Sequence, residues 1–96
     1  MSVLSNRLRD LRRKSELTVR EVADELDKSP GYISRIESRS EIPSPELLCE
    51  IADLYEVKAE ELFELAKQSY LERLTGEIDS KYQSALSFHR KSKSES

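Results

Sequence analysis

The chain has 96 residues, of which 36% are apolar and 36% are charged, and its net charge is −3 at pH 7. This length allows one small domain, the apolar fraction excludes a wholly disordered chain, and without a long uncharged apolar run we expect no transmembrane helix or signal peptide. One cysteine and one histidine are too few for a disulfide framework or a Cys/His zinc site, so we expect a cytosolic chain without metal or cofactor.

Two short helices are predicted at the start of the chain. Apolar residues at helical spacing, with arginines between them, indicate a first helix from about Val3 to Ser15. A second helix begins at Thr18, because the side chains of Thr18 and Glu21 form a capping box in which each accepts a hydrogen bond from the other residue's backbone N–H. Asp27 begins the short connection that follows.

Three further helices are predicted between residues 29 and 76. A serine cap followed by proline at the first helical position marks the start of two of them, at Ser29-Pro30 and at Ser44-Pro45. The last begins at about Ala59, and we expect it to end by Gly76, because glycine commonly follows the last turn of a helix. No segment has the alternating pattern of a β-strand, so the expected fold class is all-α.

The C-terminal part of the chain shows a weaker helical pattern. Ile78, Tyr82 and Leu86 recur at four-residue spacing and indicate a separate amphipathic helix of about three turns, which is too short to be stable alone in water. This helix needs a surface against which it can bury its apolar side. We therefore divide the chain into a domain over residues 1–67, a helical extension over residues 68–90 and a disordered, polar tail over residues 91–96.

The segment from Leu17 to Glu37 has the organisation of a helix-turn-helix, with a helix, a short turn and a second helix of two to three turns. Such a pair lets the second helix lie in the major groove of DNA while the first crosses above the backbone. This geometry alone leaves the function open, because many helical proteins contain two helices of this size.

The residues of this segment and of its neighbours match a known family. The matching runs include Leu17-Thr18, Glu21-Val22-Ala23, Ser-Pro-Gly-Tyr-Ile-Ser-Arg-Ile-Glu over residues 29–37, and Ile42-Pro43-Ser44. This pattern extends over residues 4–66 and resembles the Cro/Xre helix-turn-helix family, to which phage-type repressors belong. The resemblance implies a compact five-helix DNA-binding domain of the phage-repressor type, usually working as a dimer on a palindromic operator, here with a C-terminal helical extension.

Three positions depart from the family pattern. Val19 stands where the family often has a glutamine that binds phosphate, Asp27 stands where the turn usually has glycine, and residues 38–40 replace another common glycine. The polar contact of the glutamine is therefore missing. Asp27 can still adopt the left-handed conformation that the turn requires, at modest cost.

By this resemblance, five residues of the second helix of the motif face the bases of DNA. They are Pro30, Gly31, Tyr32, Ser34 and Arg35. Arg35 is the first candidate to read guanine, because arginine donates two hydrogen bonds to guanine O6 and N7, and the alternative is a solvated surface arginine. For Tyr32 the alternative to a DNA contact is partial packing on the preceding helix.

A second group of residues is placed to bind phosphates through hydroxyls, helix N-termini or charge. It consists of Thr18, Ser29, Ser38, Arg39 and Ser44. Arg39 can equally be a solvated residue. The resemblance also implies a structural ion pair between Arg12 and Glu37, whose loss would misplace the recognition helix because an orphaned buried charge costs about 3–5 kcal/mol.

The charge distribution is compatible with DNA binding by one face of the molecule. Residues 1–40 carry a net charge of +2, residues 41–76 a net charge of −6 and residues 77–96 a net charge of +1. The overall acidity argues against a non-specific nucleic-acid coat. Cys49 is expected to be inert and His89 to be solvated, and no acidic pair has a catalytic partner beside it, so we expect no enzymatic activity.

We therefore predict a sequence-specific regulator of transcription that binds double-stranded DNA, most often as a repressor. We expect a bacterial or phage-encoded protein that is located in the cytoplasm and lies on the nucleoid while it is bound to DNA. A homodimer is expected, because one recognition helix reads only about 4–6 base pairs. The predicted dimer interface consists of Leu65, Tyr70, Leu74, Ile78, Tyr82 and Leu86. The alternative is an antitoxin or adaptor that binds another protein, and a regulatory protein is a further possible partner of the extension.

Overall fold

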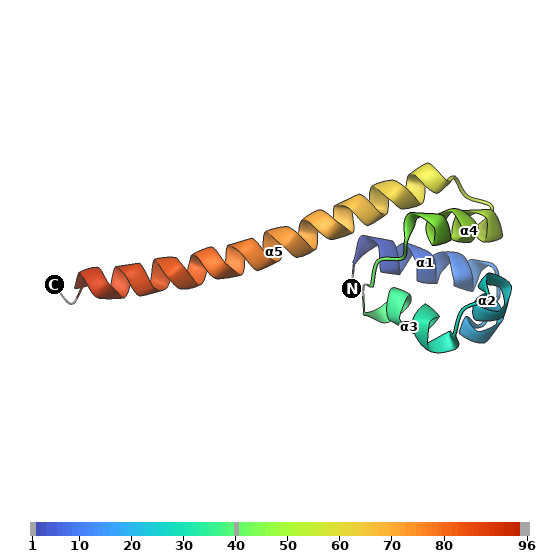
Figure 1. Cartoon of the computed structure of the whole chain (residues 1–96), viewed down its shortest axis with the longest axis horizontal. Helices are drawn as coiled ribbons and strands as arrows, with labels where there is room; N and C mark the ends of the chain where they lie inside the picture. The colour runs from blue at the N-terminus through green and yellow to red at the C-terminus, as the bar shows by residue number, and fades with distance from the viewer. Residues whose placement is uncertain (1, 40, 95–96) are drawn as a thin grey trace.

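The computed structural model describes residues 2–39 and 41–94, with side chains as far as Lys91. Five helices and no strand occur in these residues, which confirms the expected all-α fold. They are α1 (Val3–Lys14), α2 (Val19–Leu26), α3 (Pro30–Ser38), α4 (Pro45–Tyr55) and α5 (Ala59–Ser94). The first four helices and the start of α5 form a compact domain, from which the rest of α5 projects as a rod (Figure 1).

The N-termini of α2, α3 and α4 are capped as the sequence predicts. Thr18 Oγ1 accepts a hydrogen bond from the backbone N–H of Glu21 at 3.1 Å, and Glu21 Oε1 accepts one from the backbone N–H of Thr18 at 3.0 Å. Ser29 and Ser44 accept in the same way from the backbone N–H three residues further on, at 3.1 and 3.2 Å. These bonds satisfy N–H groups that have no partner within the helix, and they fix where each helix begins.

The C-termini of α2 and α4 end on residues with a left-handed backbone conformation. Asp27 has φ 54° and ψ 46°, and Glu56 has φ 56° and ψ 41°. After Asp27, the N–H of Lys28 donates to the carbonyl of Ala23 at 2.9 Å, which satisfies a carbonyl of the last turn. The left-handed aspartate expected from the sequence therefore closes the turn between α2 and α3.

The core of the domain receives side chains from all five helices. Ile33 of α3 and Leu62 of α5 are fully buried. The other buried apolar residues are Leu4, Leu8, Leu11, Val22, Ala23, Leu26, Ile36, Leu47, Leu48, Ile51, Ala52 and Ala66. Each helix thus buries one apolar stripe, and α3 keeps its other side at the surface of the domain.

Helix α5 is longer than the sequence predicts. It continues through Gly76 and includes the segment expected to be a separate helix, and it reaches Ser94, so the disorder expected from residue 91 is wrong for residues 91–94. Residues 95 and 96 lie outside the described residues. Gly76 lacks the positive φ of a helix-ending glycine, and its cost of about 1 kcal/mol relative to alanine is offset by the helix-forming residues around it. Long as it is, α5 is not apolar enough to cross a lipid bilayer, nor is any other helix in the described residues.

Ser69 is the last buried side chain along α5 among the described residues. Its Oγ accepts a hydrogen bond from the backbone N–H of Leu4 at 3.3 Å and donates one to the carbonyl of Leu65 at 2.9 Å, which attaches α5 to the start of α1. The projecting part of α5 therefore begins just after Ser69. It gives the molecule extents of 63 × 25 × 21 Å and a radius of gyration of 18.4 Å, against about 12–13 Å for a compact chain of this length.

Candidate nucleic-acid interface

Helix α3 turns one side towards the core and the other towards solvent. Ile33, Ile36 and Glu37 are buried. With about 100° between successive residues, the opposite, exposed side of α3 is formed by Gly31, Ser34, Arg35 and Ser38. Among these four, only Arg35 has a long side chain with several hydrogen-bond donors. Figure 1 shows α3 along the lower edge of the domain, with no other helix below it.

An ion pair fixes α3 to α1. Arg12 Nε donates to both carboxylate oxygens of Glu37 at 2.9 Å, and Arg12 Nη1 donates to the carbonyl of Leu17 at 3.0 Å. The exposed fractions of the Arg12 and Glu37 side chains are 15% and 6%. This is the pair that the family resemblance implied. Because both charges are largely removed from water, either one would be costly to bury without the other.

A second contact attaches α3 to α1, and the phenol of Tyr55 lies near the ion pair. Arg9 Nη2 donates to the backbone carbonyl of Glu37, which belongs to the last turn of α3. Tyr55 of α4 lies near the ion pair, where burial and then the charge of Glu37 raise the pKa of its phenol to about 12, while Arg12 lowers it. The phenol is therefore neutral at pH 7. Helices α1 and α2 thus hold α3 from the inside and present its outer face in one orientation.

Arg35 is held by two neighbours. Its Nε donates to Glu41 Oε2 at 2.9 Å, and its guanidinium carbon lies 5.5 Å from the centre of the Tyr32 ring, which is a cation–π distance. Burial raises the pKa of Tyr32, the charge of Glu41 raises it further, and Arg35 opposes the rise. Arg35 is thus an exposed arginine with one carboxylate partner and one aromatic neighbour. Tyr32 is half-buried and packs against the core, so a DNA contact would involve only its outer part.

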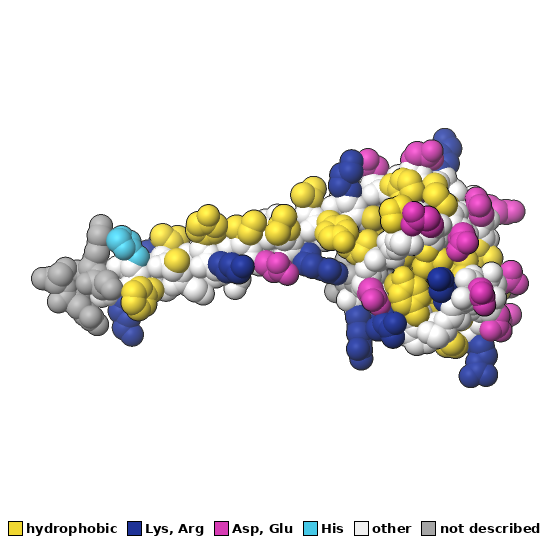
Figure 2. Space-filling model, viewed as in Figure 1, with side chains coloured by type: hydrophobic (Ala, Val, Ile, Leu, Met, Phe, Trp, Pro, Cys, Tyr) yellow, Lys and Arg dark blue, Asp and Glu magenta, His cyan; other side chains and the backbone are white. Residues whose placement is uncertain are grey.

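The residues predicted to bind phosphates lie at helix ends. Thr18, Ser29 and Ser44 are the exposed N-caps of α2, α3 and α4, where the helix dipole and the backbone N–H groups favour an anion. Arg39 is the exposed C-cap of α3, and Ser38 donates its hydroxyl proton to a carbonyl one turn earlier in α3. In Figure 2, Lys and Arg side chains extend from the lower edge of the domain, where α3 lies.

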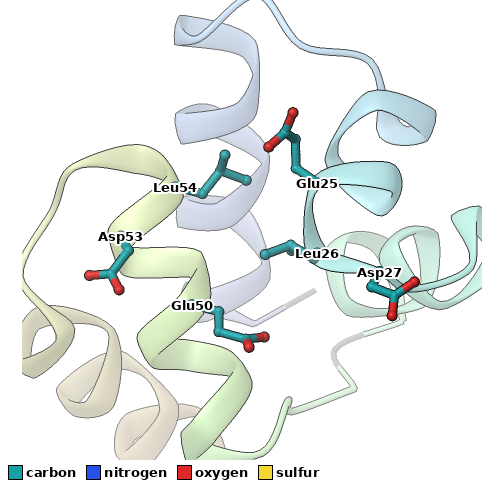
Figure 3. Close-up of a pocket in the computed structure, with 6 residues that line it drawn as sticks. All are labelled: Glu25, Leu26, Asp27, Glu50, Asp53 and Leu54. Carbon is teal, nitrogen blue, oxygen red and sulfur yellow. The ribbon is translucent and has the colours of Figure 1, made fainter.

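The side of the domain formed by α2 and α4 is acidic. A pocket of about 450 Å³ lies between the two helices, and Figure 3 shows the residues that line it: Glu25, Leu26, Asp27, Glu50, Asp53 and Leu54. In the described part of the chain, no group of three or more Asp, Glu, His or Cys residues is placed to hold a metal ion. Since carboxylates repel phosphates, this side of the domain disfavours contact with DNA.

Two contacts at this interface have no signal in the sequence. Glu41 lies six residues after Arg35, beyond the end of α3, and no helical pattern pairs residues at that spacing. The contact from Arg9 to the end of α3 requires α1 and α3 to be packed together first. Val19, at the place of the family's phosphate-binding glutamine, packs against the core instead.

The residues predicted to form a dimer interface fall into two groups. Leu65 packs against the core of its own domain and does not belong to the exposed surface of α5. The other five, Tyr70, Leu74, Ile78, Tyr82 and Leu86, are exposed, together with Leu71 and Phe88. The projecting part of α5 therefore carries most of the exposed apolar residues of this helix, and Phe63 is exposed in the domain part.

The fold and this surface define a class of protein. A small helical domain in which α2 and α3 form a helix-turn-helix, with one side of α3 exposed, has the geometry that helix-turn-helix proteins use to bind DNA. The sequence pattern of the helix-turn-helix domain family matches residues 3–65, and the chain belongs to this family. This membership agrees with the resemblance to the Cro/Xre family and makes the chain a DNA-binding regulator of transcription.

One solved structure resembles most of this arrangement. It is the crystal structure of the clp gene regulator ClgR from Corynebacterium glutamicum, with a TM-score of 0.58 and 26% sequence identity, covering 82% of this chain and 84% of that chain. The similarity spans about 79 residues of this chain, so it includes part of the projecting α5 as well as the domain. A comparison with curated proteins found no match.

Proposed function

We propose that the chain binds a palindromic DNA operator in a sequence-specific way, as a homodimer, and represses transcription there. The observation that carries this proposal is the exposed side of α3, where Arg35 stands among small residues. Small residues let a helix approach the base edges closely, and arginine is the side chain that most often reads guanine. The similar structure is, by its title, that of a gene regulator, which supports control of transcription as the role of this chain.

In this proposal, α3 supplies the base contacts and the helix ends supply the phosphate contacts. The base-contacting residues are Pro30, Gly31, Tyr32, Ser34 and Arg35. The phosphate-contacting residues are Thr18, Ser29, Ser38, Arg39 and Ser44. A Cβ placed on Gly31 would meet only Arg35 Nη1, at 3.8 Å, so the glycine leaves the surface of α3 open towards the bases.

The homodimer is proposed to form through the projecting part of α5. At about 100° per residue, seven exposed apolar residues lie along one side of this part of the helix. We call them the apolar stripe: Tyr70, Leu71, Leu74, Ile78, Tyr82, Leu86 and Phe88. Figure 2 shows hydrophobic side chains along one edge of the rod. An unpaired helix is only marginally stable in water, so the apolar stripe needs a partner surface against which it can be buried.

The partner that best fits the apolar stripe is a second copy of the chain. The residues of α5 that face the core, such as Leu62 and Ser69, lie on the opposite side of the helix, so the domain cannot cover its own stripe. The apolar surface also continues past Tyr70 into a groove of about 480 Å³ between α5 and the start of α4, which Phe63 and Leu48 help to line. Two copies would bury equivalent apolar stripes against each other.

A parallel pairing of the two α5 helices suits an operator with two half-sites. It places both domains at the same end of the paired rods, and the molecule measures 25 × 21 Å across its two shorter axes. Two domains at the same end of the rods can contact neighbouring half-sites on one DNA duplex, whose centres lie one DNA turn, about 34 Å, apart. An antiparallel pairing would instead place the domains at opposite ends of the rods.

The DNA-binding proposal is tested by selecting a preferred site from random double-stranded DNA and titrating it at several salt concentrations. The expected site is a palindrome with half-sites about 10 base pairs apart, and a promoter that overlaps it is expected to be repressed in a reporter assay.

Arg35→Ala should weaken binding by about 1–3 kcal/mol and relax the preference at one base pair. Arg39→Ala should weaken all sequences equally and lower the salt slope by about one. Selection of no preferred sequence would contradict the proposal.

The dimer is tested by light scattering on the full chain. Ile78→Glu places a charge in the apolar stripe and is expected to give monomers with reduced operator affinity. Ser80→Glu adds the same charge on the opposite side of α5 and is the matched control, which should remain dimeric. A monomeric wild-type chain would contradict the homodimer and leave a different protein as the occupant of the stripe.

The orientation of the pair is tested by disulfide crosslinking in a Cys49→Ser background. In a parallel dimer each stripe residue meets its own counterpart, so Leu74→Cys and Tyr82→Cys should both crosslink. In an antiparallel dimer only residues near one central point meet themselves. Crosslinking at a single position would therefore contradict the parallel arrangement.

A further inference from the structure

Glu41 has a position on the recognition surface that folding does not explain. The side chains of Arg35 and Glu41 are 45% and 46% exposed, and exposed ion pairs contribute little to folding stability because water screens the charges. A carboxylate close to DNA phosphates is also unfavourable for binding. The side-chain contact that Glu41 does make is with Nε of Arg35.

The bond between the two residues leaves a particular part of the guanidinium group available. Glu41 accepts from Nε of Arg35 at 2.9 Å, and the Tyr32 ring lies 5.5 Å from the guanidinium carbon. The remaining donors of Arg35 are on Nη1 and Nη2, and Nη1 lies over Gly31, on the outer side of α3. Two neighbouring donors of this kind match the O6 and N7 acceptors of guanine.

Glu41 is itself held in place by the backbone on both sides. Its N–H donates to the carbonyl of Arg35 at 3.4 Å, which brings the chain back over the end of α3. The residues that follow it, Ile42 and Pro43, are half-buried and buried against the domain. The backbone of Glu41 is therefore placed beside the end of α3 by the fold, within reach of the Arg35 side chain with which its carboxylate pairs.

We propose that Glu41 is a positioning residue for base recognition, which holds Arg35 by Nε so that Nη1 and Nη2 meet the O6 and N7 of a guanine. A held arginine loses less side-chain freedom when it binds guanine, and it is restrained from turning to a phosphate. Glu41 thereby raises the preference for guanine while it lowers the affinity for DNA of any sequence. This inference rests on the proposed function, in which Arg35 reads a base.

The test compares the affinity of the full chain for its selected operator with its affinity for a variant operator. The variant replaces the one base pair at which Arg35→Ala relaxes the preference. Glu41→Ala removes the acceptor and is expected to lower this affinity ratio about threefold to tenfold, while the affinity for unrelated DNA rises. Glu41→Gln keeps an oxygen that accepts from Nε, and it should retain most of the ratio.

Glu25→Ala is the matched control for charge, because it removes one carboxylate from the acidic pocket between α2 and α4. It should leave the affinity ratio unchanged. A double-mutant cycle then shows whether the effect of Glu41 passes through Arg35. In the Arg35→Ala background, Glu41→Ala is expected to have no further effect on the ratio. The melting temperature of Glu41→Ala should equal that of the wild type, because the pair is exposed.

Three results would overturn the inference. The ratio could be unchanged in Glu41→Ala, it could fall equally in both Arg35 backgrounds, or it could rise, which would show that Glu41 competes with guanine for Arg35. Failure of the proposed function gives a different result, because a wild-type chain without any preferred sequence fails at the selection step. If the preference for guanine depends on Arg35 but not on Glu41, this inference is wrong while the proposed function still holds.

Discussion

Helix α5 passes through two regions in which apolar residues at helical spacing have opposite environments. Inside the domain, α1 and α4 pack against it, and Leu62 is fully buried. Beyond Ser69 the apolar residues are exposed, with 67% of Tyr82 and 75% of Phe88 accessible to solvent. The local sequence makes a helix in both regions, but only packing against other elements turns an apolar stripe into a core. The domain therefore has a core as its source of stability, whereas the described part of the rod beyond Ser69 has no buried side chain.

The largest expected effect concerns the buried ion pair inside the domain. Glu37→Ala leaves Arg12 buried without its partner, and we expect the free energy of unfolding to fall by about 3–5 kcal/mol in denaturant titrations. Glu61→Ala is the matched control, because it breaks the more exposed pair with Arg7 and should cost no more than about 1 kcal/mol. Similar losses of unfolding free energy in Glu37→Ala and Glu61→Ala would contradict the expectation that burial decides how much an ion pair contributes to the stability of the domain.

Leucine truncations in the two regions of α5 sharpen the comparison directly. Leu62→Ala leaves a cavity in the core, and we expect it to destabilise the domain by about 2–5 kcal/mol. Leu74→Ala removes the same atoms from the apolar stripe and should leave the unfolding of the domain almost unchanged, while it weakens dimerisation. Chemical unfolding and light scattering on both variants separate the two outcomes. A domain that loses stability in Leu74→Ala would show that the rod is part of its core.

The raised pKa of Tyr55 predicts how the stability of the domain changes at alkaline pH. Burial, and then the charge of Glu37, raise the pKa of its phenol to about 12 in the folded chain, above the value of about 10 for a tyrosine in the unfolded chain, so the folded state keeps the proton longer. The corresponding stability is present below pH 10 and is lost as the pH rises towards 12, by about 2 kcal/mol. Tyr55→Phe should flatten this loss in denaturant titrations between pH 9 and 12. Tyr82→Phe, in the rod, is the control and should retain the full loss.

The smallest expected effect is at Gly76 in the rod. A Cβ at this position would meet no atom within 4 Å, and alanine is favoured over glycine inside a helix by about 1 kcal/mol. Gly76→Ala should therefore raise the helix content of the full chain, measured by circular dichroism, and strengthen the proposed dimer slightly. A weaker dimer would contradict the assignment of the interface to the apolar stripe, because Gly76 lies on the other side of α5.

Local chemistry explains which elements were predictable. The starts of α2, α3 and α4 depend on a capping side chain and a backbone N–H three residues away, so Thr18, Ser29 and Ser44 could be recognised in the sequence. The predicted end at Gly76 was wrong, because a glycine ends a helix only when the backbone turns left-handed there, and its neighbours decide that. Asp27 does turn left-handed, as expected from its place in the motif.

Several local features are determined by the sequence alone, because each depends on residues within a few positions of one another. These features are the order of the helices, their caps, their apolar stripes and the recognition segment. The surroundings of Arg35 were decided by the tertiary structure alone. Glu41 reaches Arg35 only because the chain folds back over the end of α3, and Leu65 faces the core only because α5 packs on α1 and α4. Contacts of this kind depend on how packed helices are oriented, and a pattern along the chain records periodicity but not orientation.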